Sequence, residues 1–212
     1  MIEGTAPFAV NFNRLSPYQG SNKDVDVVLD LMIHDTNLVL DLIGTQPVRV
    51  NAYGMTAFSG TVDHAVANLE FEGGPILSMV ASRVTEHKVR TIQVTNPEAY
   101  LDCDLLNKSI SVHRCTIGEY LSNNHRGVKY RQESIVERIN VPTFEPLLLQ
   151  FQHFVDCVLD GTSPAVTARD GYEALKLATD IRDAILPKMI DMKELISEQS
   201  QILRPITRLT PA

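Results

Sequence analysis

The strongest constraint on the fold is a run of alternating apolar and polar residues between Pro47 and Val141. Apolar residues at every second position are typical of strands that bury one face. Short turn sequences such as Glu72-Gly73-Gly74-Pro75 separate the strands, and connections this short force neighbouring strands to run antiparallel. The run therefore predicts one large, mostly antiparallel sheet. Its expected strands span 48–57, 64–71, 76–84, 89–95, 99–104, 109–116 and 129–140.

One face of this sheet is expected to be polar. Residues 8–14 predict a first strand that places Asn11 and Asn13 on the face opposite Val10 and Phe12. The later strands repeat the pattern with Asn68, Glu70, Thr91, Gln93, Ser109, Ser111 and His113. We therefore expect a single α+β domain over residues 1–212, with helices packed on one face of an open sheet.

Residues 26–43 predict a helix that is apolar on nearly all sides. Asp24 and Asp26 favour its start electrostatically, and Gly44 with Pro47 ends it. A helix with so narrow a polar face is packed on most sides, so we expect that face to look into a cleft inside the protein.

The narrow polar face of this predicted helix, which we call the polar stripe, consists of four residues: Asp30, His34, Asn37 and Asp41. They fall within an arc of roughly 60° at about 100° per residue. An aspartate and a histidine one turn apart can influence each other's protonation, which makes them candidates for acid–base chemistry. The alternative is a hydrogen-bonded polar pair within a core. A metal site would need further ligands, and no third ligand stands at helical spacing.

Two charged residues near the stripe are expected to have other roles. Asp35 lies in the apolar arc, and we expect it to pair with a cation or a backbone donor because an unpaired buried carboxylate is costly. Arg14, at the end of the first strand, either binds a substrate anion or pairs with Asp35. Tyr18 and Asn13 are weaker candidates for substrate contact.

Two closing helices are expected within residues 144–186. The first spans 144–159, with Thr143 as its cap, and the second spans 171–186 after a capping box at Thr167 and Asp170. We expect the apolar stripes of both helices to be core; these include Leu147, Leu148, Phe151, Phe154, Val155, Val158, Leu175, Ala178, Ile181 and Ile185. We also expect a polar loop at 118–127 and, within the tail 187–212, a helical stretch at 189–202.

Composition excludes several classes of function. The net charge of −7 and the lack of a basic run argue against nucleic acid as a partner. No apolar segment approaches the ~20 residues that cross a bilayer, and the N-terminus has no signal-peptide pattern. The three cysteines, Cys103, Cys115 and Cys157, form no Cys-x-x-Cys pair and are expected to be structural. We expect a cytoplasmic protein.

The usual cofactor motifs are absent from the sequence. It contains no Gly-x-Gly-x-x-Gly, no Gly-x-x-x-x-Gly-Lys-Ser/Thr and no Gly-x-Ser-x-Gly. Whatever chemistry Asp30 and His34 perform, we therefore expect this chain to lack the partner that carries electrons or phosphate.

Four pieces of the sequence, in order, resemble the C-terminal domain of the Gfo/Idh/MocA family of NAD(P)-dependent sugar oxidoreductases. They are Asp30-x-x-x-His34-Asp35 in a helix ending at Gly44, Pro47-Val-x-Val-x-Ala-x-Gly54, Asp63-His-Ala-Val-Ala-x-Leu-x-Phe71, and Phe154-x-x-x-Val158-Leu-Asp-Gly161-x-x-Pro164 continuing to Asp170-Gly171. The resemblance covers about residues 8–185. It implies a domain with a large open sheet and helices on one face, which contributes the Asp-x-x-x-His helix and a subunit interface.

The resemblance also implies roles for individual residues. His34 would take the proton from the substrate hydroxyl, and Asp30 would orient the imidazole and hold the sugar. Beside these two roles, our own candidates for contact with a sugar or nucleotide-sugar substrate are Arg14, Tyr18, Asp26 and Asn37. NAD or NADP would be bound mainly by an N-terminal Rossmann domain, which also supplies a lysine and which this chain lacks. The chain is thus expected to be inactive alone and to form a homo-oligomer through the open sheet.

The sequence also departs from the family pattern. Val25-Asp26 replaces the usual Gly-Gly pair, and Asn37 stands where a second Asp is common. The run from Arg14 to Tyr18 looks most like members that handle nucleotide-linked amino sugars. The alternative to an enzyme fragment is a non-catalytic dimerisation or scaffold module that assembles through its sheet.

Overall fold

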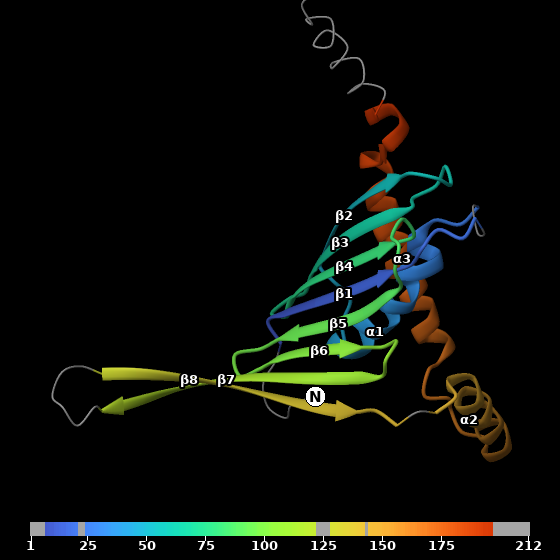
Figure 1. Ribbon diagram of the computed structural model, residues 1–212. Coiled ribbons are helices and arrows are strands. Elements are labelled where there is room, and N and C mark those ends of the chain that lie inside the picture. Colours follow the sequence, from blue (N-terminus) through green and yellow to red (C-terminus); the bar gives the residue numbers. More distant parts are fainter. Residues whose placement is uncertain (1–6, 21–23, 122–127, 143, 197–212) are drawn as a thin grey trace, which may run out of the picture.

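A nine-stranded sheet forms the body of the protein in the computed structural model, which describes residues 7–20, 24–121, 128–142 and 144–196 (Figure 1). The strand order is β8-β7-β6-β5-β1-β4-β3-β2-β9. The strands span Ala9–Leu15 (β1), Arg49–Thr56 (β2), His64–Glu70 (β3), Ile76–Ser82 (β4), Val89–Thr95 (β5), Tyr100–Asp104 (β6), Ser109–Leu121 (β7), Val128–Asn140 (β8) and Ile190–Asp191 (β9).

The sheet is mixed, and most neighbouring strands run antiparallel, as the short turns predict. The two parallel pairs are β1 with β4 and β2 with β9. Both pairs join strands that are distant in the sequence, so the turn argument does not apply to them. The first strand inserts between β4 and β5, where the register opposes Phe12 to Met79 on one side and to Ile92 on the other.

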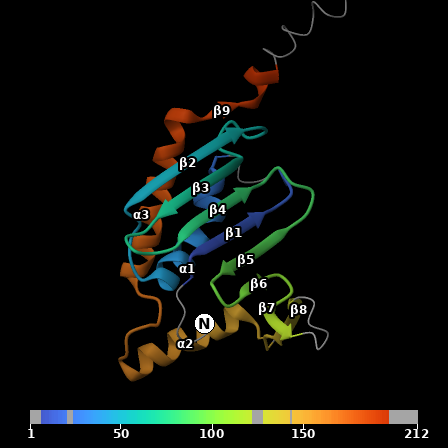
Figure 2. The same ribbon diagram turned by 90° about the vertical axis from the view of Figure 1, so that its left-hand side faces the viewer.

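Helices α1 (Ile33–Ile43) and α3 (Ala168–Ile185) cover one face of the sheet, together with a π-helical turn, η1 (Val28–Met32), that precedes α1 (Figures 1 and 2). The helix α1 ends at Gly44, which has a φ of 79°, as predicted. Predicted core positions Ala178, Ile181 and Ile185 are buried, whereas Leu175 is exposed, contrary to the prediction. The core lies between these helices and the alternate residues of β1 to β4: Val10, Phe12, Ala52, Ala65, Ala67, Leu69, Leu77, Met79 and Ala81.

The opposite face of the sheet is open and carries a row of polar side chains in matched register. The row runs across seven strands from β2 to β7, so that each member opposes the next. Hydrogen bonds join some neighbours, such as Ser78 Oγ to Asn68 Oδ1 at 2.7 Å. We call this set the open-face row; it consists of Asn51, Asn68, Ser78, Asn11, Gln93, Asp102 and Ser111. The predicted polar face is confirmed.

The first closing helix, α2 (Pro146–Asp160), does not pack on the sheet. It lies beyond the β7–β8 end, on the side of the helices (Figure 1). Cys157 is its one buried side chain in the described part of the chain. The prediction that its apolar stripe is core is therefore wrong, because amphipathic spacing shows that a helix has an apolar face but not what lies opposite that face.

Other sequence expectations have mixed outcomes. The capping box is confirmed: Thr167 Oγ1 accepts from the amide of Asp170, whose carboxylate accepts from the amide of Thr167. The predicted loop at 118–127 is wrong for residues 118–121, which belong to β7, and residues 122–127 lie outside the described part. Thr143 and residues 197–212 also lie outside it. Within the tail, Ile190–Asp191 is a strand rather than a helix, and residues 192–196 are helical. Across the described residues, every helix is too short or too polar to span a membrane.

Gly54 is required by the close approach of α3 to β2. A Cβ at this position would lie 2.7 Å from Ile185 Cγ2 and 2.8 Å from Val62 Cγ1, both in the core. Replacing Gly54 with alanine is therefore expected to lower the free energy of unfolding by about 1–3 kcal/mol, as overpacking does. Urea unfolding followed by circular dichroism measures the loss. Gly171→Ala in α3, where a Cβ would meet nothing within 4 Å, is the control and should cause no loss. Equal stability of both variants would contradict the tight contact.

Candidate active site

The turn η1 and the helix α1 form one continuous helix, which we call the site helix, and the carboxylate of Asp26 caps its start. Asp26 Oδ1 accepts hydrogen bonds from the amides of Val28 (2.9 Å) and Leu29 (3.0 Å). These two amides have no carbonyl partner within the helix, so the carboxylate stabilises the first turn. The geometry gives Asp26 a structural task, and any contact with substrate has to use its other oxygen.

The first turn of the site helix is wider than the sequence predicts. The amide of Ile33 donates to the carbonyl of Val28, five residues earlier, and residues 28–32 are π-helical. Turns of this kind are rare and occur frequently at functional sites. Asp30 lies within this turn and His34 lies just after it. The wider turn therefore changes the angle around the helix axis between these two side chains.

The polar stripe is exposed rather than enclosed. His34 and Asp41 are exposed, and Asp30 and Asn37 are half-buried. The expectation of an enclosed cleft is wrong for His34, which is exposed, because α3 packs against the side of α1 that carries Thr36. Thr36 marks that contact: its Oγ1 lies 2.8 Å from the carbonyl of Ile33 and 3.0 Å from that of Ala174 in α3. The stripe is therefore open to anything that approaches from the side of the helices.

Arg14 and Asp35 form a buried ion pair beneath the stripe. The guanidinium Nε and Nη2 contact the two carboxylate oxygens at 2.8 and 2.5 Å, a bidentate arrangement. Of the two roles predicted for Arg14, the geometry supports the pairing with Asp35 over a substrate anion. The expected structural role of Asp35 is confirmed. This pair fixes the end of β1 to the first turn of α1, directly after His34.

Tyr18 stacks on Phe58 with ring centroids 4.9 Å apart. The contact joins the segment after β1 to the turn after β2. Tyr18 is half-buried, so its ring has a packing role whether or not it meets a substrate. Asn13, a weaker candidate, faces the open side of the sheet, where its amide lies 3.4 Å from Thr91 Oγ1. Asn13 therefore does not share a face with the stripe.

Asp63 holds the turn after β2, next to the start of the site helix. This role was not identified from the sequence. Its Oδ2 accepts from the amides of Ala57, Phe58 and Ser59 at 2.7–3.0 Å, and its Oδ1 accepts from the Ser59 hydroxyl at 2.6 Å. Burial alone would raise the pKa of Asp63, but these hydrogen bonds outweigh it and hold the pKa below the usual value.

Arg83 links this carboxylate to the start of the site helix. Its Nε lies 3.6 Å from Asp63 Oδ1, and its Nη2 donates to the carbonyl of Val25 at 2.5 Å. The amide of Val27 also donates to the carbonyl of Val62 at 2.9 Å. The turn around Asp63 thus positions the residues on either side of Asp26, and through them the first turn of the site helix.

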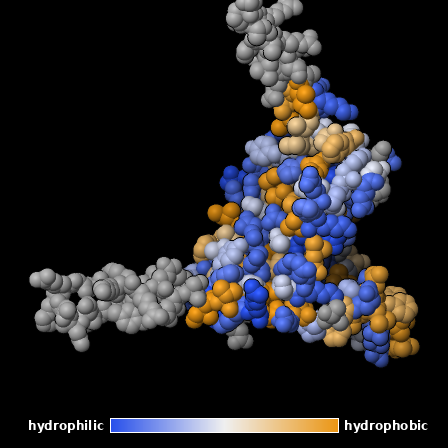
Figure 3. All heavy atoms as spheres, viewed as in Figure 1, coloured by the Kyte–Doolittle hydropathy of each residue, from blue (hydrophilic) through white to orange (hydrophobic). Residues whose placement is uncertain are grey.

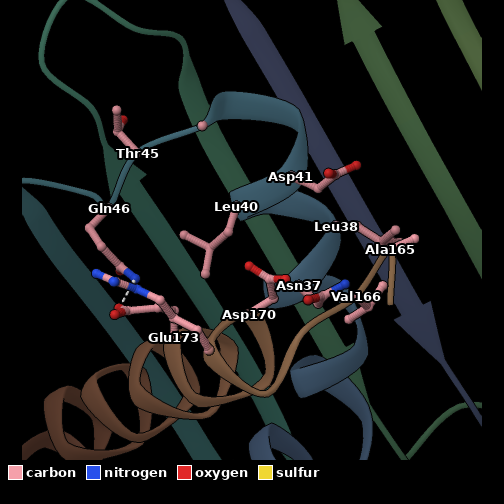
Figure 4. A pocket seen from close by; sticks show the side chains of 12 residues that line it. Asn37, Leu38, Leu40, Asp41, Thr45, Gln46, Ala165, Val166, Asp170 and Glu173 are labelled. Carbon is pink, nitrogen blue, oxygen red and sulfur yellow. Dashed lines mark hydrogen bonds between the residues drawn. The ribbon is translucent and has the colours of Figure 1, made fainter. Parts of the chain in front are cut away.

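A pocket of about 760 Å³ lies where the C-terminal half of α1 meets the start of α3 (Figure 4). Asn37 and Asp41 of the stripe line it from α1, and Arg169, Asp170 and Glu173 line it from α3. Gln46 Nε2 donates to Glu173 Oε2 at 2.8 Å across its wall. Carboxylates and amides can bond the hydroxyl groups of a polyol. The sequence gives no signal for the α3 residues, because their approach to α1 is tertiary.

A family model described as the GFO/IDH/MocA C-terminal domain matches residues 9–101. Among curated proteins, the UDP-N-acetylglucosamine 3-dehydrogenase of Acidithiobacillus ferrooxidans is 34% identical over 108 residues, which is 51% of this chain and 34% of that protein. The scyllo-inositol 2-dehydrogenase (NAD(+)) of Bacillus subtilis is 22% identical over 178 residues, which is 79% of this chain and 48% of that protein.

Solved structures of related proteins share the fold. The structure of the Acidithiobacillus ferrooxidans dehydrogenase superposes with a TM-score of 0.71 at 27% identity, covering 86% of this chain and 56% of that one. A levoglucosan dehydrogenase in complex with NADH superposes with a TM-score of 0.65 at 13% identity, covering 87% and 57%, and shows the fold alone. The chain thus spans between a third and three fifths of the length of these relatives.

Proposed function

We propose that this chain, in which a model of the GFO/IDH/MocA C-terminal domain matches residues 9–101, is the substrate-binding and self-associating part of a nicotinamide-dependent oxidoreductase acting on a sugar or nucleotide-sugar hydroxyl. Its two curated relatives are dehydrogenases, and one of them is named for NAD(+). The observation that carries the proposal is the exposed stripe, in which Asp30 and His34 stand at the π turn that opens the site helix.

In this proposal His34 handles the proton of the reaction. The imidazole takes the proton of the substrate hydroxyl while the carbon that bears this hydroxyl loses a hydride and becomes a carbonyl. Histidine exchanges protons near neutral pH, which suits it to this step. The hydride would pass to a nicotinamide cofactor, when one is bound. Asp30, half-buried on the same stripe, orients the imidazole and bonds the sugar.

The rest of the stripe extends the binding surface. Asn37 and Asp41 lead from His34 into the pocket beside Arg169 and Glu173, so a sugar bound at His34 has polar partners for its more distant groups. The curated relative named for a UDP-linked amino sugar supports a nucleotide sugar as the substrate class. At the other end of the stripe, Tyr18 and Asp26 are the nearest candidates for contact with the substrate.

The cofactor itself is assigned to a separate domain. The sequence has no glycine-rich phosphate-binding motif, and the chain covers only part of its relatives' length. We assign self-association to the open face of the sheet, which no helix covers in the described residues (Figure 2). The open-face row supplies directional donors and acceptors for a second copy.

If substrate and cofactor bind to separate domains, the chain alone should bind the substrate and not the cofactor. Isothermal titration of the 212-residue chain with UDP-N-acetylglucosamine should give binding, whereas titration with NADH should give none up to millimolar concentration. Asn37→Ala should weaken binding of the nucleotide sugar, and Asn13→Ala, on the opposite face, is the control that should leave it unchanged. Tight binding of NADH by the chain alone would overturn the assignment of the cofactor to another domain.

A further inference from the structure

The position of His34 depends on the backbone that carries it. Its imidazole is exposed, and among the described residues it forms no hydrogen bond, ion pair or ring contact with another side chain. The backbone just before it, Val28–Met32, is π-helical. A π turn shifts the residues that follow it around the helix axis. Contacts elsewhere on the helix therefore have to fix the orientation in which His34 leaves it.

Two contacts fix the site helix directly after His34. The carboxylate oxygens of Asp35 accept from Nε and Nη2 of Arg14 at 2.8 and 2.5 Å. On the side of α3, Thr36 Oγ1 lies 3.0 Å from the carbonyl oxygen of Ala174. Two parallel hydrogen bonds between planar groups set an angle as well as a distance. The ion pair thus restricts the rotation of the helix one residue after the imidazole.

Arg14 comes from the most firmly held strand of the sheet. All seven residues of β1 pair with β4 on one side and with β5 on the other. Such an element places a functional group more exactly than a loop does. Helix α2 shows the contrast: of its described residues Cys157 alone is buried, and apolar side chains gather on the surface there (Figure 3). An apolar face does not by itself fix a helix to this sheet.

An ion pair is an unusual way to join β1 to α1 at a buried position. The side chains of Arg14 and Asp35 are only 9% and 5% exposed, so both charges have lost most of their water. Well-packed apolar residues at such positions are often equally or more stabilising. Apolar contacts have no preferred direction, however, whereas the bidentate pair has one geometry. What the pair adds beyond an apolar contact is orientation.

We propose that Arg14 and Asp35 are positioning residues, whose bidentate pair fixes the orientation in which the site helix presents His34 to the substrate hydroxyl. The inference rests on the proposed function, in which His34 takes the proton of that hydroxyl. A misplacement of about 1 Å at a reacting group can lower the rate on the order of 10²-fold. Loss of the pair should therefore lower kcat more than it weakens substrate binding.

The test replaces both partners at once. Arg14→Met combined with Asp35→Leu removes both charges and leaves an apolar contact, so the double variant should unfold at the urea concentration of the wild type. With UDP-N-acetylglucosamine, NAD(+) and the cofactor domain supplied, its kcat should fall at least tenfold. Arg14→Lys, which keeps the charge but not the planar fork, should also lower kcat and serves if the double variant unfolds early.

The matched control removes an ion pair that lies elsewhere. Arg114 Nη1 and Glu137 Oε1 are 3.0 Å apart between β7 and β8, and both side chains are more than 40% exposed. Arg114→Met combined with Glu137→Leu should keep the wild-type kcat. Calorimetry with UDP-N-acetylglucosamine should give a Kd within about threefold of wild type for both double variants, because a positioning role affects the chemical step rather than binding.

A second measurement on the 212-residue chain needs no cofactor domain. In the Arg14→Met, Asp35→Leu variant, the amide residual dipolar couplings of residues 33–36 should differ from wild type, whereas those of residues 174–181 in α3 should not. Wild-type stability together with unchanged couplings and unchanged kcat would overturn the proposal and leave the pair a structural role alone. The proposed function fails on a different result, full turnover in His34→Ala, and the couplings test the orientation in either case.

Discussion

Replacing His34 with alanine is expected to lower the turnover of a sugar or nucleotide sugar by about 10²–10⁴-fold once the cofactor domain is supplied. The variant lacks the base that takes the hydroxyl proton, whereas the side chain is exposed and contributes little to folding. The loss should therefore fall on kcat, with a smaller change in KM. Stopped-flow absorbance at the wavelength of NADH measures it.

Two further variants make this result specific to the site. Asp30→Asn should also lower kcat, by less than His34→Ala, because the imidazole stays in place without its carboxylate neighbour. His113→Ala, on the open face, is the matched histidine control and should keep full activity. If His34→Ala and Asp30→Asn were both as active as wild type, the chain would be a scaffold rather than the catalytic part of an oxidoreductase.

Replacing Asp63 with alanine is expected to lower the free energy of unfolding by about 3–5 kcal/mol, as removal of one partner of a buried ion pair does. The change leaves three amides at the turn without their acceptor and leaves Arg83 without its carboxylate. Chemical denaturation at neutral pH measures the loss. Asp104 is half-buried and also accepts turn amides but forms no ion pair within the described residues, so Asp104→Ala is the control and should cost much less.

The stability that Asp63 contributes should depend on pH in a defined direction. Its pKa is lower in the folded protein than the ordinary value of 3.8, so the unfolded chain binds a proton at a higher pH than the folded one. The stabilisation is thus complete well above pH 3.8 and is lost as the pH falls through the folded pKa. Unfolding curves between pH 7 and pH 2.5 should show this loss in wild type and a shallower dependence in Asp63→Ala. Parallel profiles would contradict the lowered pKa.

The strands of the sheet could be predicted from the sequence because the pattern that marks each strand is local. Alternation and short turns define β2 to β6 to within two residues at each end. The parallel insertion of β1 between β4 and β5 could not be predicted this way, since it depends on pairing across sixty or more residues. The brief strand β9 at Ile190 is set by its neighbour β2 rather than by its own pattern.

The residues of the candidate site could be predicted from the sequence, but their exposure and the geometry of the helix that carries them could not. Helical spacing placed Asp30, His34, Asn37 and Asp41 on one stripe, and the pairing of Asp35 followed from the cost of burying a lone carboxylate. The exposure of the stripe depends on where α3 packs, and the π turn depends on tertiary contacts of residues 28–33. Neither leaves a local signal. The role of Asp63 arises from a turn whose amides converge only in the folded protein.

The alternation of residues along strand β1 determines which mutations in this strand the protein can tolerate. Its even residues, Val10, Phe12 and Arg14, face the helices, and its odd residues, such as Asn11, face the open side. A point substitution in β1 therefore alters the helix-covered face or the open face, and not both. An insertion or deletion of one residue in this central strand would exchange the two sets at once and place Arg14 on the wrong side of the sheet. Substitutions in β1 can thus change the two faces of the sheet independently, while the length of the strand is held fixed.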